Sequence, residues 1–134
     1  MKLILFLDSA GGMLFNGRRQ SQDRILREYI LNMTREKKLW MNGYSQKQFK
    51  TAEGIFLSES PQRDAALGDF VLIENLPPVL DGVSEVILCL WNERYPADVY
   101  FDRASLAREG FSLAERVDIA GYSHEKITIE HHRR

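Results

Sequence analysis

The sequence is poor in the residues that form disulfides and bind metals. It contains one cysteine, Cys89, and three histidines, at positions 124, 131 and 132. A lone cysteine excludes an internal disulfide and a tetrathiolate metal site, so we expect a buried, inert thiol in the apolar segment 86–91. The histidine spacing matches no common metal motif. We therefore expect no bound metal.

Long hydrophobic runs and an excess of charge are also absent. The apolar runs are far too short for a signal-peptide core or a membrane span, so we expect a cytoplasmic protein that does not enter a membrane. The chain has 18 Lys and Arg against 19 Asp and Glu, which gives a formal net charge of -1. The net charge therefore does not favour binding of nucleic acid across the whole surface. Any binding of nucleic acid would be confined to a local part of the surface.

What the sequence does contain is typical of one globular domain. The chain has 134 residues, of which 44% are hydrophobic and 28% charged, enough to bury a substantial core. It has no internal repeat, low-complexity tract or linker. We therefore predict a single domain that spans residues 1–134.

The first half of the chain alternates segments typical of strands and of helices. Residues 2–8 form an apolar run, as expected of a strand in the middle of a sheet. Ser21 is the predicted N-cap of the first helix, with Asp23 in its first turn, and Ser45 is a predicted cap of a short helix that ends at Phe49 or Thr51. We predict further strands over 38–42, 54–58 and 69–74, a helix over 22–35, and one helical turn or two within 61–67.

The second half favours strands with little room for helices between them. We predict these strands over 85–92, 97–101, 111–117 and 125–132. Residues 126–130 alternate apolar and polar side chains, which is typical of an antiparallel strand near a sheet edge. The predicted fold class is a single-domain α/β fold with a mixed, mostly parallel sheet, helices in the first half and antiparallel C-terminal strands.

The segment that follows the first strand is the main candidate binding site. Residues 9–17 contain three glycines and lead into an arginine-rich helix start, so we predict a long polar loop. Helix N-termini and guanidinium groups both favour negative charge, which makes this a plausible place for an anionic ligand. The candidate ligand-binding residues here are Gly12, Asn16, Gly17, Arg18 and Arg19.

Several candidate residues have two interpretations that the sequence leaves open. The cluster Arg18, Arg19, Arg24 and Arg27 either holds a phosphate or carboxylate, or is a solvated face paired with neighbouring acids. His124 is a candidate acid or base, although the sequence shows no Ser-His-Asp pattern around a nucleophile elbow. Trp40 and Trp91 are predicted core residues, with stacking on a ligand ring as the alternative.

The order of these segments resembles the dihydrofolate reductase fold, including the related reductase domain of riboflavin biosynthesis. The residues that carry the resemblance are Leu7 to Gly17, Ser21-Gln22-Asp23, Leu39 to Ser45, Tyr95 to Phe101 and Ser123 to Ile129. At the family's cofactor-binding turn this chain has Asn42-Gly43 in place of Gly-Arg, and no Gly-Gly step follows its later strands.

The resemblance implies a ligand cleft at the carboxyl end of the first strand. It implies NADPH as the cofactor of a reductase that acts on a pterin or pyrimidine-type substrate. In that hypothesis Asp23 is the catalytic residue, which binds the ring or handles a proton, and its alternative role is that of a helix cap. Ser21, Asn42 and Ser45 are further candidate ligand- or cofactor-binding residues.

Other hypotheses belong to different functional classes. The chain also resembles small bacterial proteins sometimes labelled ribonuclease Z, but its three histidines cannot form the metal cluster of a two-metal hydrolase. A non-catalytic module could bind RNA, a nucleotide or an acidic protein through the segment Arg18 to Arg27. A homodimer could form through the predicted edge strand 125–132.

Overall fold

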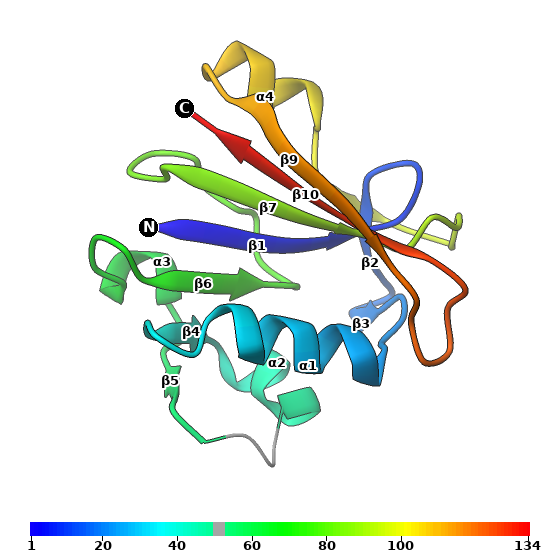
Figure 1. Cartoon of the computed structure of the whole chain (residues 1–134), viewed down its shortest axis with the longest axis horizontal. Coiled ribbons are helices and arrows are strands. Elements are labelled where there is room, and N and C mark those ends of the chain that lie inside the picture. Colours follow the sequence, from blue (N-terminus) through cyan, green and yellow to red (C-terminus); the bar gives the residue numbers. More distant parts are fainter. Residues whose placement is uncertain (50–52) are drawn as a thin grey trace.

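β1 (Lys2–Leu7) is the middle strand of the main sheet, as the apolar run of residues 2–8 predicts. The computed structural model of the protein describes residues 1–49 and 53–134. The main sheet has seven strands in the order β5-β4-β6-β1-β7-β10-β9 (Figure 1). Its other strands are β4 (Leu39–Met41), β5 (Ile55–Leu57), β6 (Phe70–Ile73), β7 (Glu85–Leu90), β9 (Ser112–Ile119) and β10 (Ile127–Arg133).

Pairing within this sheet confirms the predicted fold class. β1 pairs in parallel with β6 and β7, and β4 pairs in parallel with β5 and β6. β10 pairs antiparallel with both β7 and β9. The carboxyl ends of β1, β4, β6 and β7 therefore lie at one edge of the sheet, where ligands bind in many open α/β sheets.

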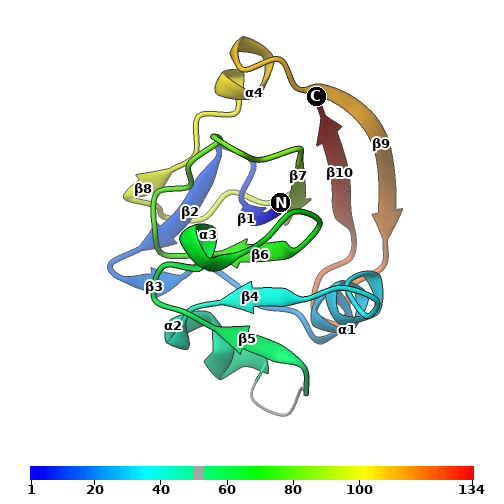
Figure 2. The ribbon, with the colours of Figure 1, turned by 90° about the vertical axis from the view of Figure 1, so that its left-hand side faces the viewer.

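The two faces of β1 are buried under different elements. Leu3, Leu5 and Leu7 belong to a cluster that includes side chains of β2, α4 and the segment around Phe101. Ile4 and Phe6 belong to the cluster on the opposite face, which includes side chains of α1. Figure 2 shows the main sheet between α1 on one side and β2 and β8 on the other. This double coverage explains why β1 is apolar at every position from 3 to 7.

The segment predicted as a polar loop is a β-hairpin instead. β2 (Gly12–Phe15) pairs antiparallel with β3 (Arg18–Arg19) and with β8 (Val99–Tyr100) to form a second, three-stranded sheet. Asn16 and Gly17 connect β2 to β3 with φ angles of 52° and 72°, and such a pair of positive φ angles is typical of a tight two-residue hairpin turn. The loop prediction was wrong because it overlooked the Asn-Gly signal.

Two predicted helix caps lie at different residues. α1 (Arg24–Met33) is capped by Asp23 rather than Ser21, and α2 (Gly43–Gln46) is capped by Asn42 rather than Ser45. A 3-10 turn (Lys47–Phe49) follows α2, and the alternative end at Thr51 lies outside the described residues. α3 (Pro61–Asp64) is a single turn, which agrees with the prediction of one helical turn or two within 61–67, and α4 (Ala104–Arg108) was not predicted. Among the described residues, no helix has the length and apolarity to span a membrane.

Residues 127–133 form an antiparallel strand near a sheet edge, as predicted, but they are not the edge strand that the homodimer hypothesis requires. β10 lies between β7 and β9, and β9 is the outermost strand (Figure 1). The homodimer hypothesis assumed that residues 125–132 form an edge strand, so its structural basis is lost. The predictions that Cys89 and Trp91 are core residues are confirmed, since both are buried. Trp40 is only half-buried, and its Nε1 donates to Asp69.

Candidate functional site

A buried carboxylate at the end of β1 organises the candidate site. Asp8 has no exposed surface. Its Oδ1 accepts the backbone N–H groups of Ala10 and Gly12, both at 2.8 Å, and its Oδ2 accepts Gln20 Nε2 at 2.9 Å and Tyr95 N at 3.2 Å. Burial raises the pKa of Asp8, but these hydrogen bonds together lower it by a larger amount. The net pKa therefore lies below its usual value. Asp8 thus fixes the hairpin and the turn around Tyr95 to the central strand.

Gly12 is required by close packing against this carboxylate. A Cβ atom at position 12 would lie 2.6 Å from Asp8 Oδ2 and 2.7 Å from the Cβ of Ala97. Gly12 therefore has a packing role, because the absence of a side chain lets the hairpin approach β1, and its role in ligand binding stays a prediction. The hairpin is further tied down where Asn16 N donates to Asp98 Oδ2 at 3.0 Å.

A surface groove lies between the hairpin and the turn at Tyr95 and Pro96. Its volume is about 300 Å³, at the lower end of the range for small-molecule sites. Phe15 is 47% exposed, and Arg18 is also exposed. The lining residues are Phe15, Asn16, Arg18, Arg19, Gln20, Tyr95 and Pro96. Three predicted site residues, Asn16, Arg18 and Arg19, therefore line one groove, whereas Gly17 lies in the turn beside it and Gly12 lies beneath it.

Arg19 joins the hairpin to the turn that follows β4. Its Nε and Nη2 donate to the two carboxylate oxygens of Glu74 at 3.1 and 3.2 Å, and Nη2 also donates to the Tyr44 carbonyl at 3.2 Å. The guanidinium carbon lies 4.6 Å from the centre of the Tyr44 ring. Glu74 is buried, and the positive charge of Arg19 balances its negative charge. Most of the binding capacity of this guanidinium is therefore used within the chain.

The predicted residues Asn42 and Ser45 lie in that turn but do not line the groove. Asn42 Oδ1 accepts Ser45 N at 3.1 Å, and its Nδ2 donates to Asn75 at 2.8 Å. Gly43 N donates to a carboxylate oxygen of Glu59 at 3.0 Å. Ser45 is fully buried, and its hydroxyl has no hydrogen-bond partner within the described residues. This turn contacts Arg19 through Tyr44, but none of its residues lines the groove.

Asp23 lies in a second polar cluster, at the start of α1. His124 Nδ1 lies 2.8 Å from Asp23 Oδ2, and Ser21 Oγ lies 2.8 Å from His124 Nε2. Trp91 stacks on the imidazole ring at a centroid distance of 4.6 Å. The remaining donors to Asp23 are the backbone N–H groups of Ile25, Leu26, Tyr122 and Ser123 and the Ser123 hydroxyl. The sequence did not reveal this Ser-His-Asp arrangement, because about a hundred residues separate its two halves.

The electrostatics of this cluster keep Asp23 ionised. Burial raises its pKa, but hydrogen bonds from Tyr122, His124, Ser123 and Leu26 outweigh burial and hold the pKa well below its usual range. Gly121 allows the chain to come this close, since a Cβ there would lie 2.8 Å from Asp23 Oδ2. Asp23 is therefore both the cap of α1 and the anchor of the β9–β10 loop.

The arginine cluster of the sequence does not form one binding face. Arg24 lies over the ring of Tyr122 at 4.2 Å, and Arg27 donates to Gln22 at 3.4 Å. Arg19 is paired with Glu74. Only Arg18 combines an exposed side chain with a position in the groove. Neither of the two interpretations of the cluster holds for all of its members.

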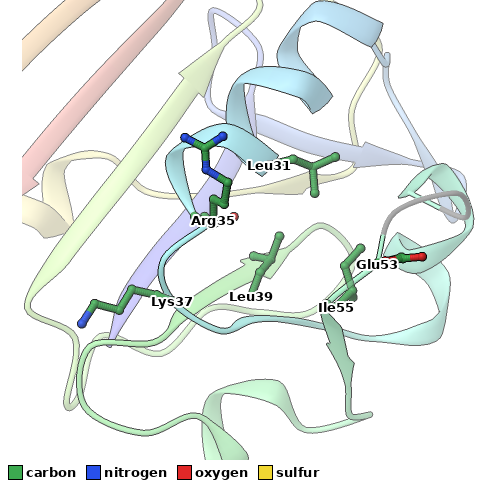
Figure 3. A pocket seen from close by; sticks show the side chains of 8 residues that line it. Leu31, Arg35, Lys37, Leu39, Glu53 and Ile55 are labelled. Atoms are coloured by element: carbon green, nitrogen blue, oxygen red, sulfur yellow. The ribbon is translucent and has the colours of Figure 1, made fainter.

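A separate hollow of about 260 Å³ lies near the C-terminal end of α1. Figure 3 shows the apolar side chains of Leu31, Leu39 and Ile55 facing one another, while Arg35 and Lys37 extend away from them. None of the predicted site residues lines this hollow. In the described part of the chain, no group of three or more His, Cys, Asp and Glu residues is arranged to hold a metal ion.

Comparison with known proteins identifies the fold. No protein-family model and no curated protein sequence matches the chain. Among solved structures, the chain is similar to dihydrofolate reductase from Enterococcus faecalis complexed with NADP(H) and RAB-propyl, with a TM-score of 0.69 and 12% sequence identity. The match covers 99% of this chain and 95% of that one. Nothing in these comparisons supports the resemblance to proteins labelled ribonuclease Z. The chain has a dihydrofolate reductase-like fold.

Proposed function

We propose that the protein binds a small ligand that carries an aromatic ring and an anionic group, in the groove between the β2–β3 hairpin and the Tyr95–Pro96 turn. The observation that carries this proposal is the lining of the groove. It combines the exposed ring of Phe15 and the exposed guanidinium of Arg18 on the hairpin with the phenol of Tyr95 on the facing turn. Aromatic faces offer stacking surfaces, and a guanidinium group binds phosphate or carboxylate.

The scaffold around the groove is well ordered for binding. Asp8 holds Gln20 and the Tyr95 backbone, and Arg19 is held by Glu74, so these lining residues are fixed by buried contacts. Arg18 is the exposed charged side chain in this frame. A ligand that enters therefore orders one long side chain rather than a whole loop, which limits the entropy lost on binding.

We expect Arg18→Ala to weaken the binding of adenosine 5′-monophosphate about tenfold, because one charge-assisted hydrogen bond is lost. The measurement is a titration followed by amide chemical shifts, which should change at Arg18, Gln20 and Tyr95. The matched control is Arg27→Ala, which removes an arginine of the same sequence cluster that lies outside the groove. Equal weakening by both variants, or shifts confined to the hollow around Leu31 and Arg35, would contradict the proposal.

NADPH-dependent reduction is the second candidate function, favoured by the full-length structural similarity to a reductase complexed with NADP(H). The residues present fit its phosphates poorly. The N–H of Gly43 is bonded to Glu59, and the guanidinium of Arg19 is bonded to Glu74, so the chain's own carboxylates take these donors. Asp23, the ring-binding or proton-handling group in this hypothesis, has both oxygens engaged. We derive no reaction step through this cofactor.

Tryptophan fluorescence and thermal unfolding separate the two candidates. A reductase predicts that NADPH quenches the fluorescence and raises the melting temperature. The groove proposal predicts that adenosine monophosphate binds and that millimolar NADPH binds no more tightly than the mononucleotide does. Single-stranded RNA is a third ligand to test, and affinity that falls steeply with salt would indicate contacts to the nucleic-acid backbone.

A further inference from the structure

We propose that Ser21 is a nucleophilic hydroxyl, with His124 as its general base and Asp23 as the residue that positions the base. The substrate class is a small carboxylic ester, whose acyl group passes to Ser21 with release of the alcohol and is then hydrolysed from it. This activity is separate from ligand binding in the groove. The proposal rests on the chain of contacts from Ser21 through His124 to Asp23, two links of 2.8 Å each.

The direction of the hydrogen bonds follows from the charge on Asp23. Because its oxygens accept five other hydrogen bonds and its pKa is held low, the carboxylate is an acceptor, and His124 Nδ1 must be the donor. In the neutral imidazole, Nε2 is then the acceptor and the Ser21 hydroxyl donates to it. This is the tautomer that a general base needs in order to accept a proton from a serine.

The imidazole ring is also fixed in orientation. Trp91 stacks on it with an interplanar angle of 28°, and the His124 side chain is 7% exposed. Ser21 is partly buried, whereas Asp23 and His124 are buried, so the serine is the least buried of the three. A rigid base behind a serine that is not fully buried is the arrangement that nucleophilic catalysis requires.

The groove lies next to Ser21, since its lining includes Gln20, which precedes Ser21 in the chain. Tyr95 lines the groove, and its phenol contacts the Ser21 hydroxyl. The same phenol donates to Glu93 at 3.0 Å. Burial raises the pKa of Tyr95, so the phenol stays protonated at neutral pH. Its single proton is donated to Glu93, and it stabilises an oxyanion beside Ser21 only by turning away from Glu93.

The reaction balances without a further reagent except water. Ser21 Oγ attacks the ester carbonyl while its proton passes to His124 Nε2. The bond to the alcohol then breaks, and the departing oxygen takes that proton, which leaves an acyl group on Ser21. Water attacks the acyl group, again losing a proton to His124, and release of the acid restores the serine hydroxyl.

A fluorophosphonate probe tests the nucleophile directly, since Ser21 would displace fluoride and keep the phosphonyl group. We expect one adduct, mapped by mass spectrometry to Ser21, together with hydrolysis of p-nitrophenyl acetate. Ser21→Ala should abolish both. The matched control is Ser58→Ala, because Ser58 is hydrogen-bonded to Asp64 without an intervening histidine.

His124→Asn separates catalysis from a structural role. The asparagine amide is able to replace Nδ1 as the donor to Asp23 but supplies no base at the position of Nε2. We expect this variant to keep a cooperative unfolding transition while its labelling rate falls about a hundredfold or more. Labelling of His124→Asn at the wild-type rate, or a folded wild-type protein whose Ser21 is labelled no faster than Ser58, overturns the proposal. Neither result bears on binding of adenosine monophosphate in the groove.

Discussion

Asp23→Ala is expected to lower the free energy of unfolding by about 3 to 5 kcal/mol, because it leaves several buried donors without an acceptor. The carboxylate caps α1 through Ile25 and Leu26 and holds the β9–β10 loop through Tyr122, Ser123 and His124. These two segments lie about a hundred residues apart in the chain. Their shared acceptor makes Asp23 a tertiary crosslink as well as a helix cap.

Chemical denaturation measures this loss. Asp23→Asn should lose less than Asp23→Ala, because the amide keeps one oxygen to accept the capping N–H groups. The matched control is Asp102→Ala, since Asp102 also accepts a backbone N–H at the start of a helix but is exposed, so little change is expected. If Asp23→Ala is no less stable than the control variant, the buried cluster does not hold the two segments together.

The pH dependence of this difference follows from the lowered pKa of Asp23. A carboxyl group whose pKa is lower in the folded state stabilises the protein above its unfolded pKa of about 3.9. Its contribution is lost as the pH falls through the folded pKa. The stability gap between the wild type and Asp23→Asn should therefore be constant near neutral pH and shrink under acidic conditions below about pH 4.

The sequence predicted the sheet better than it predicted the candidate site. The apolar runs of β1 and β7 indicate buried strands, because a strand covered on both faces needs apolar residues at successive positions. The turn after β2 was predicted wrongly, since Asn16-Gly17 closes a hairpin where we predicted a loop. Both errors at helix starts have one cause, because any of several neighbouring polar residues is able to cap a helix.

The contacts that build the two polar clusters could not be predicted from local patterns. Arg19 binds Glu74, which lies 55 residues further along the chain, and Asp8 binds the backbone of Tyr95, 87 residues away. Neither contact is marked by a motif in the sequence, because each depends on which strands become neighbours in the fold. His124 was a weak candidate from its sequence context alone. Its importance comes from Asp23, Ser21 and Trp91, which the fold places around it.

Asp8→Ala is the second large effect that we expect, and it tests whether the groove depends on the buried carboxylate at the end of β1. The substitution leaves the N–H groups of Ala10, Gly12 and Tyr95 without their acceptor and leaves the Gln20 side chain with only its bond to the Pro96 carbonyl. We expect the free energy of unfolding to fall by about 3 to 5 kcal/mol. The measurement is chemical denaturation.

Binding of adenosine monophosphate to the folded fraction of Asp8→Ala should also weaken, because Gln20 and Tyr95 line the groove and lose a shared anchor. The matched control is Asp98→Ala, which removes an exposed carboxylate that accepts one N–H of the same hairpin. Unchanged affinity in folded Asp8→Ala would mean that the hairpin keeps its shape through its other contacts, which include β2–β8 pairing and the ion pair of Arg19 with Glu74. Weakened affinity, with the control unchanged, would show that the central strand sets the geometry of the groove through this one carboxylate.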